Sequence, residues 1–271
     1  MALTVALPLR LPGQLRSGPD TVIVRAGTLT LHGLLWRPTG RGPFPAILFN
    51  HGSHSAGDTL RATEPLAIGP VFARHGYVFL FLLRRGVGLS ADQGQADGDL
   101  MNSAFSSGGQ EARDRIQLEL LDGEQLNEAF AGLAFLRALT EVDAKRIGVV
   151  GHSFGGSLTI LMAARDPGIR AAVVFSGAGY SWNLSSALRN RLMAAVGHTT
   201  TPIFFNHAAN DYSTAPGTQL ASEMERLHRP HLLKIYPPFG SSPREAHSLV
   251  YRSVVTWEAD VFGFLGRYLH P

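Results

Sequence analysis

The sequence predicts an α/β fold in which helices cover both faces of a mostly parallel β-sheet. The first observation is that short apolar runs alternate with longer helical patterns from about residue 46 to the end of the chain. The second is that these runs are continuously apolar, as at residues 46–49, which is typical of strands buried on both faces. No repeat or composition break divides the 271 residues, so we expect one domain over residues 1–271.

The first expected elements are an irregular leader over about residues 1–19 and an antiparallel hairpin formed by residues 21–25 and 29–36. The buried strands that follow are predicted at residues 46–49, 77–83, 146–150, 171–175, 203–206 and 232–236. Helices are predicted near residues 64–75, over about 110–139 with a possible break at Asp122-Gly123, and over 154–164 and 250–269.

Two further stretches, about 86–108 and 178–200, are predicted to be lid segments over an active site. The first is rich in Gly, Asp, Ser and Gln, and it is too long for an ordinary connection. We therefore expect the first stretch to be an irregular, functional loop.

Composition excludes several classes of protein. With 45% hydrophobic and 17% charged residues, the chain can bury a sizeable core. The formal net charge is only +3, and the basic residues are scattered apart from the adjacent pair Arg84-Arg85, so no polybasic surface for nucleic acid is expected. The chain has no cysteine, so a nucleophile must be an alcohol, an amine or a carboxylate.

No cofactor, metal or membrane span is expected. His51 and His54 have a spacing that metal ligands sometimes show, but no carboxylate cluster accompanies them. No segment approaches the roughly 20 apolar residues that a membrane span needs, and the N-terminus lacks a basic signal-peptide region. We expect a cytoplasmic protein that acts on a small molecule, and the sequence leaves its oligomeric state open.

One motif carries the predicted chemistry. Residues 151–155 read Gly-His-Ser-Phe-Gly, directly after a predicted strand and before a predicted helix. In this setting a Gly-x-Ser-x-Gly motif forms a tight turn that exposes the hydroxyl of its serine, here Ser153. The first N–H groups of the helix that follows favour a developing oxyanion. The alternative is that the Gly-x-Ser-x-Gly pattern occurs here by chance. Its place between a strand and a helix makes that explanation the weaker one, so Ser153 is the predicted nucleophile.

These features resemble the α/β-hydrolase superfamily and, within it, the dienelactone hydrolase-like serine esterases. Asn50-His51-Gly52-Ser53 resembles the oxyanion loop of the family, and residues 84–90 resemble its Arg-Gly-x-Gly-x-Ser stretch. The resemblance covers the chain from about residue 20 to its end. Dienelactone hydrolases proper use cysteine as their nucleophile, so Ser153 favours a general esterase.

The fold places its acid after a late strand and its histidine before the last helix, in the chain order Ser, acid, His. Asp211 follows the strand at 203–206 and His247 precedes the closing helix, so these two are the predicted partners of Ser153. Asp211 could instead be a turn residue. His152, at the second position of the motif, is expected to point away from the site.

The backbone N–H groups of Phe154 and Ser53 are the predicted oxyanion donors. Tyr180 and Trp182 are predicted to bind substrate, although helical packing on the core explains this stretch equally well. For Arg84 and its neighbour Arg85, structural ion pairs are favoured over binding of a substrate carboxylate.

The leading hypothesis is therefore a carboxylesterase that works through an acyl-enzyme. A peptidase of the prolyl-oligopeptidase type shares the catalytic domain and is the alternative, although the chain is too short to include a propeller domain. A binding protein without catalysis is the third hypothesis, and an intact Ser, Asp and His in order argues against it.

Overall fold

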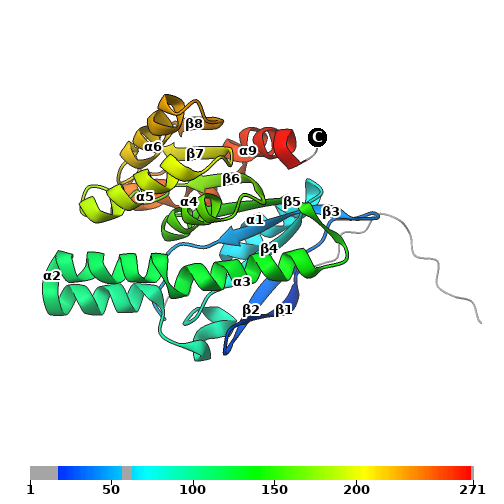
Figure 1. Cartoon of the computed structure of the whole chain (residues 1–271), viewed down its shortest axis with the longest axis horizontal. Coiled ribbons are helices and arrows are strands. Elements are labelled where there is room, and N and C mark those ends of the chain that lie inside the picture. Colours follow the sequence, from blue (N-terminus) through cyan, green and yellow to red (C-terminus); the bar gives the residue numbers. More distant parts are fainter. Residues whose placement is uncertain (1–17, 57–62, 270–271) are drawn as a thin grey trace, which may run out of the picture.

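The computed structural model describes residues 18–56 and 63–269 (Figure 1). Within these ranges, eight strands form one sheet with the spatial order β1-β2-β4-β3-β5-β6-β7-β8. The strands are β1 (Asp20–Ala26), β2 (Leu29–Trp36), β3 (Phe44–Asn50), β4 (Val78–Leu83), β5 (Val142–His152), β6 (Ile169–Phe175), β7 (Ile203–Ala208) and β8 (His231–Tyr236).

Strand β2 runs antiparallel to both of its neighbours, while β4, β3, β5, β6, β7 and β8 pair in parallel. The predicted hairpin and the predicted mostly parallel sheet are both confirmed. The chain moves from β3 outward to β4 on one side and then to β5 on the other, which makes β3 the point where strand order reverses. Ligands of such open sheets bind beyond the carboxyl ends of the strands at this point.

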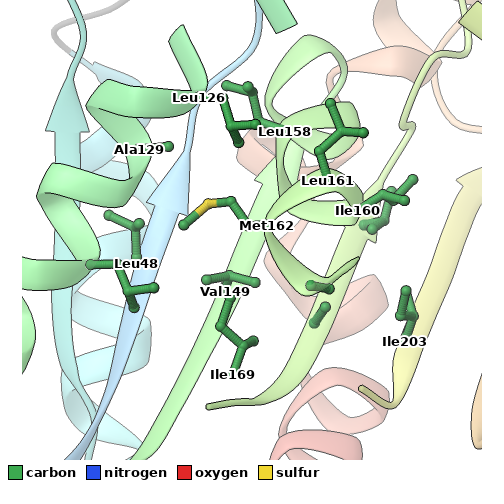
Figure 2. Packing of buried hydrophobic residues seen from close by; sticks show 14 of the residues in the cluster. Leu48, Leu126, Ala129, Val149, Leu158, Ile160, Leu161, Met162, Ile169 and Ile203 are labelled. Atoms are coloured by element: carbon green, nitrogen blue, oxygen red, sulfur yellow. The ribbon is translucent and has the colours of Figure 1, made fainter. Parts of the chain in front are cut away.

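Helices cover both faces of the sheet. Successive side chains of a strand point to opposite faces, so the core consists of two clusters, one on each face. In β3, Ala46 and Leu48 face one cluster of buried side chains, while Ile47 and Phe49 face the other. The first cluster packs under α3 (Glu124–Ala138), α4 (Phe154–Arg165), α5 (Ser186–His198) and α6 (Ala215–Arg226). Figure 2 shows Leu126 of α3 and Leu158 of α4 over Leu48 and Val149 of the sheet. The second cluster packs under α1 (Thr63–Arg74), α8 (Leu249–Arg252) and α9 (Val254–Leu269).

The prediction of an irregular loop over residues 86–108 is wrong in its second half. A short 3₁₀ helix (Gly88–Gln93) is followed by α2 (Asp97–Asp122), in which only Gly108 and Gly109 leave helical geometry. At this break the two arms of α2 fold back on each other, project from the body of the molecule (Figure 1) and line a shared crevice. The break predicted at Asp122-Gly123 is confirmed, because α3 begins at Glu124.

The predicted leader falls almost entirely on residues 1–17, which lie outside the described ranges. In the part of the chain that the structure describes, no helix combines the length and the apolar character needed to cross a membrane.

Candidate active site

Ser153 lies in a strained turn between β5 and α4. Its backbone has φ 54° and ψ −116°, in the left-handed half of conformational space that residues with a side chain rarely adopt. The turn demands glycine on both sides. A Cβ on Gly151 would lie 2.2 Å from the carbonyl oxygen of Gly155, and a Cβ on Gly155 would lie 2.0 Å from that of Asn50. The turn predicted from the motif is therefore present.

The structure brings the three predicted catalytic side chains together. His247 Nε2 lies 2.8 Å from Ser153 Oγ, and His247 Nδ1 lies 2.7 Å from Asp211 Oδ1. Ser153 follows β5 and Asp211 follows β7, while His247 closes the short helix α7 (Pro243–His247) beyond β8. All three lie beyond the carboxyl ends of parallel strands, so residues far apart in sequence meet at one edge of the sheet.

The Asp211 carboxylate is buried and receives more than one hydrogen bond. Its Oδ1 also accepts a hydrogen bond from the backbone N–H of Tyr212, at 2.7 Å, and its Oδ2 lies 3.1 Å from Nδ1 of a second histidine, His207. Burial raises the pKa of Asp211, but the hydrogen bonds from His207 and His247 outweigh it and hold the pKa well below its ordinary value. Asp211 is therefore ionised at neutral pH. The contact with His207 was not predicted from the sequence, although its spacing of four residues before Asp211 at the end of a strand is a usable signal.

The predicted oxyanion loop lies beside the nucleophile. A Cβ on Gly52 would lie 3.4 Å from Ser153 Cβ, so the backbone of this loop passes close to the serine. Arg84 is buried and its guanidinium donates to the carbonyl oxygens of His51, at 3.0 Å, and Gly52, at 3.2 Å. Asp97 at the start of α2 pairs with Arg84 and accepts a hydrogen bond from the backbone N–H of the loop residue His54.

Arg84 therefore holds the loop in place, in agreement with its predicted structural ion pair. Its neighbour Arg85 pairs with Glu124 and Glu128 of α3. The predicted donors Phe154 and Ser53 both line the cavity in front of Ser153.

The expectation that His152 points away from the site is wrong, because His152 lines the cavity beside Ser153 and contacts His247. Its ring lies 4.9 Å from the ring of His247, and its Nε2 lies 2.7 Å from the backbone carbonyl oxygen of His247. Burial, followed by repulsion from a charged His247, lowers the pKa of His152 to about 3. His152 is therefore neutral, and its Nε2–H donates to the segment that carries His247.

A cavity of about 800 Å³ opens onto Ser153 and His247. Tyr180 lines it and is 49% exposed, as its predicted role requires. Trp182 does not line the cavity: it is 1% exposed and belongs to the core cluster under α4 and α5. The alternative of packing on the core is therefore correct for Trp182, and of the stretch 178–200 only Ala178, Tyr180 and Ser181 line the cavity.

The first predicted lid stretch, 86–108, reaches the cavity through Met101 on the first arm of α2. The second arm adds Arg113 and Gln117. Arg113 lies over the ring of Tyr180 at 5.4 Å, and Tyr180 in turn packs edge-on against Tyr212, which contacts His247. Arg244 also lines the cavity, and neither Arg113 nor Arg244 has a carboxylate partner among the ion pairs of the described residues. Within those same residues, no cluster of three or more His, Asp or Glu side chains is placed to hold a metal ion.

A mostly parallel sheet with a nucleophile turn after one strand, and an acid and a histidine after two later strands, is the arrangement of the α/β-hydrolase fold. Residues 31–252 match the model of the dienelactone hydrolase family. The chain therefore belongs to the dienelactone hydrolase family. A curated relative from Bradyrhizobium sp, described as a probable 2-oxo-3-(5-oxofuran-2-ylidene)propanoate lactonase, is 24% identical over 228 residues, which are 83% of this chain and 84% of the relative.

Solved structures with the same fold include an esterase and two other kinds of hydrolase. The Pyrococcus furiosus esterase has a TM-score of 0.64 at 16% identity and is matched over 97% of this chain and 100% of its own. The Anabaena variabilis dienelactone hydrolase has a TM-score of 0.60 at 17% identity, over 93% of this chain and 99% of its own. The Pyrococcus horikoshii acylaminoacyl peptidase has a TM-score of 0.63 at 17% identity, over 93% of this chain but only 42% of its own. The chain thus spans less than half the length of that peptidase.

Proposed function

We propose that the protein is a serine hydrolase that cleaves carboxylic esters through an acyl-enzyme. The observation that carries the proposal is the hydrogen-bonded series from Ser153 through His247 to the ionised Asp211, beside an open cavity. Such a series turns a weakly nucleophilic hydroxyl into an efficient one.

In the proposed reaction, Ser153 Oγ attacks the ester carbonyl carbon while its proton passes to His247 Nε2. The negative charge that forms on the carbonyl oxygen is stabilised by the backbone N–H groups of Phe154 and Ser53. Collapse of the tetrahedral intermediate breaks the bond to the alcohol, which leaves with the proton from His247. Water then attacks the acyl-enzyme by the same steps, and the carboxylic acid and free Ser153 are formed.

A Ser153→Ala variant tests this directly. We expect kcat for p-nitrophenyl acetate to fall by about three orders of magnitude or more, because the attacking oxygen is lost. Ser181→Ala is the matched control, since Ser181 lines the same cavity outside the catalytic series. Full activity of Ser153→Ala would overturn the proposal.

The likeness to acylaminoacyl peptidase keeps amide cleavage as an alternative reaction of the same three residues. Matched p-nitrophenyl esters and p-nitroanilides of the same acyl group decide between them. The proposal predicts that the ester is hydrolysed with the higher kcat/KM, and a higher kcat/KM for the anilide would favour a peptidase.

A second candidate function is hydrolysis of esters or lactones that carry a carboxylate, as the name of the Bradyrhizobium relative describes for that protein. Arg113 and Arg244 favour it, since both line the cavity without a carboxylate partner among the described ion pairs. Charge-assisted hydrogen bonds to a substrate carboxylate are among the stronger polar contacts.

Arg113→Gln and Arg244→Gln test this candidate. We expect KM for the p-nitrophenyl monoester of succinic acid to rise by about tenfold or more in either variant, because a charge-assisted hydrogen bond is worth about 1.5–3 kcal/mol. KM for the uncharged p-nitrophenyl butyrate should stay within about twofold. Equal changes for both substrates would contradict recognition of a carboxylate.

A further inference from the structure

His207 is a buried polar side chain that the proposed mechanism does not use. It lies in β7, where the strand pairing sets it opposite Ile235 of β8, and its side chain is 1% exposed. On its other side the ring contacts α6 so closely that a Cβ on Gly217 would lie 2.8 Å from its Cδ2 and 2.9 Å from its Nε2. Strand and helix together therefore leave the ring little freedom to move.

The ring of His207 contacts the carboxylate of Asp211, whose position is otherwise set by the turn that carries it. Asp211 follows β7 in a turn closed by a hydrogen bond from its own N–H to the carbonyl oxygen of Ala208, at 3.1 Å. Its Oδ1 faces His247 Nδ1 at 2.7 Å, and its Oδ2 faces His207 Nδ1 at 3.1 Å. The carboxylate has no exposed surface, so no bulk water reaches Oδ2.

We propose that His207 is a positioning residue: its Nδ1–H donates to Asp211 Oδ2 and so keeps Oδ1 directed at His247. A carboxylate rotates readily about its last bond, and a donor on each oxygen fixes that rotation. The orientation of Asp211 sets the ring orientation and tautomer of His247, which determine how well Nε2 takes the proton of Ser153. The inference rests on the proposed function for its kinetic consequence, whereas the hydrogen bond itself can be tested without any activity.

The matched variants His207→Asn and His207→Leu distinguish the effect of the hydrogen bond on kcat from the effect of side-chain volume. The amide nitrogen of Asn and one terminal carbon of Leu each lie one bond beyond Cγ, as Nδ1 does, so only Asn keeps a donor there. We expect kcat of His207→Leu to be about tenfold below that of His207→Asn, because Asp211 Oδ2 is then a buried acceptor without a donor and the carboxylate can turn away from His247. KM should differ by less than about twofold between the two variants, since His207 does not line the cavity.

Equal kcat values in the two variants would overturn the proposal, because His207 would then act only through its volume. A second measurement on the unchanged protein does not depend on the folding of either variant. Proton–nitrogen NMR of ¹⁵N-histidine-labelled protein should show a proton on Nδ1 of His207, with its signal displaced in Asp211→Asn. A proton on Nε2 alone would overturn the proposal, whether or not Ser153→Ala abolishes hydrolysis.

Discussion

At the scale of single residues, three histidines surround the predicted acid and nucleophile, and each has a different environment. His247 contacts Ser153 and Asp211, His207 contacts Asp211 but not Ser153, and His152 donates to the backbone carbonyl oxygen of His247. Chain order predicted Asp211 and His247, because the order Ser, acid, His follows from the fold. The expected outward orientation of His152 was wrong, and the orientation of His207 was not predicted, since both depend on packing against α7 and α6.

The lowered pKa of His152 makes a prediction about stability. Its ordinary pKa is 6.5 and burial lowers it to about 3 in the folded protein. Between these values the unfolded chain takes up a proton that the folded protein does not, so the free energy of unfolding falls as the pH falls. The contribution of this one group is about 1.4 kcal/mol per pH unit.

A His152→Gln variant should remove that contribution, while its amide group replaces Nε2–H as donor to the carbonyl oxygen of His247. Urea unfolding at pH 7, 5.5 and 4.5 measures the effect. As the pH falls, we expect the free energy of unfolding of the wild type to fall steadily relative to that of the variant. An identical pH dependence in both proteins would contradict a buried, neutral His152.

At the scale of elements, α4 makes a very close contact with the end of β3 and the oxyanion loop that follows it. Gly155 on α4 lies against the carbonyl oxygens of Asn50 and His51, at 2.0 Å and 2.3 Å from the place where a Cβ would be. Backbone atoms on both sides cannot yield, so the glycine keeps the oxyanion loop beside Ser153.

We therefore expect Gly155→Ala to lower the free energy of unfolding by about 1–3 kcal/mol and to reduce activity, because α4 and the loop must move apart. Gly263→Ala is the matched control: Gly263 lies in α9 with no atom within 4 Å of a new Cβ. That change should raise stability by about 0.5–1 kcal/mol, since alanine favours the helix interior. Thermal unfolding of both variants is the measurement, and a Gly155→Ala protein as stable and active as wild type would contradict the account.

The strands were predictable from sequence because buried parallel strands are continuously apolar, but the first arm of α2 was not. Its residues include Gly, Ser, Asp and Asn, which are weak helix formers. Contacts with distant residues stabilise it instead, including the hydrogen bond from His54 to Asp97 and that from Ala56 to Asp99. Trp182 was ambiguous for a related reason, since helical spacing does not tell a core side chain from a cavity wall.

At the scale of the whole molecule, the cavity is formed by segments from most of the chain. Its wall includes the loop after β3, both arms of α2, the region of α7 and α8, and the residues Ala178, Tyr180 and Ser181. The strand order explains how they meet, because every parallel strand directs its following loop to the same edge of the sheet.

The central claim, that Ser153 is the nucleophile of one catalytic series with His247 and Asp211, is tested most directly with a fluorophosphonate. Intact mass and peptide mapping should show one phosphonyl group per chain, on Ser153, in proportion to the loss of esterase activity. His247→Ala should be labelled far more slowly, because the base that activates Ser153 is absent. Complete inactivation with the phosphonyl group on another residue, or full activity with Ser153 modified, would contradict the account.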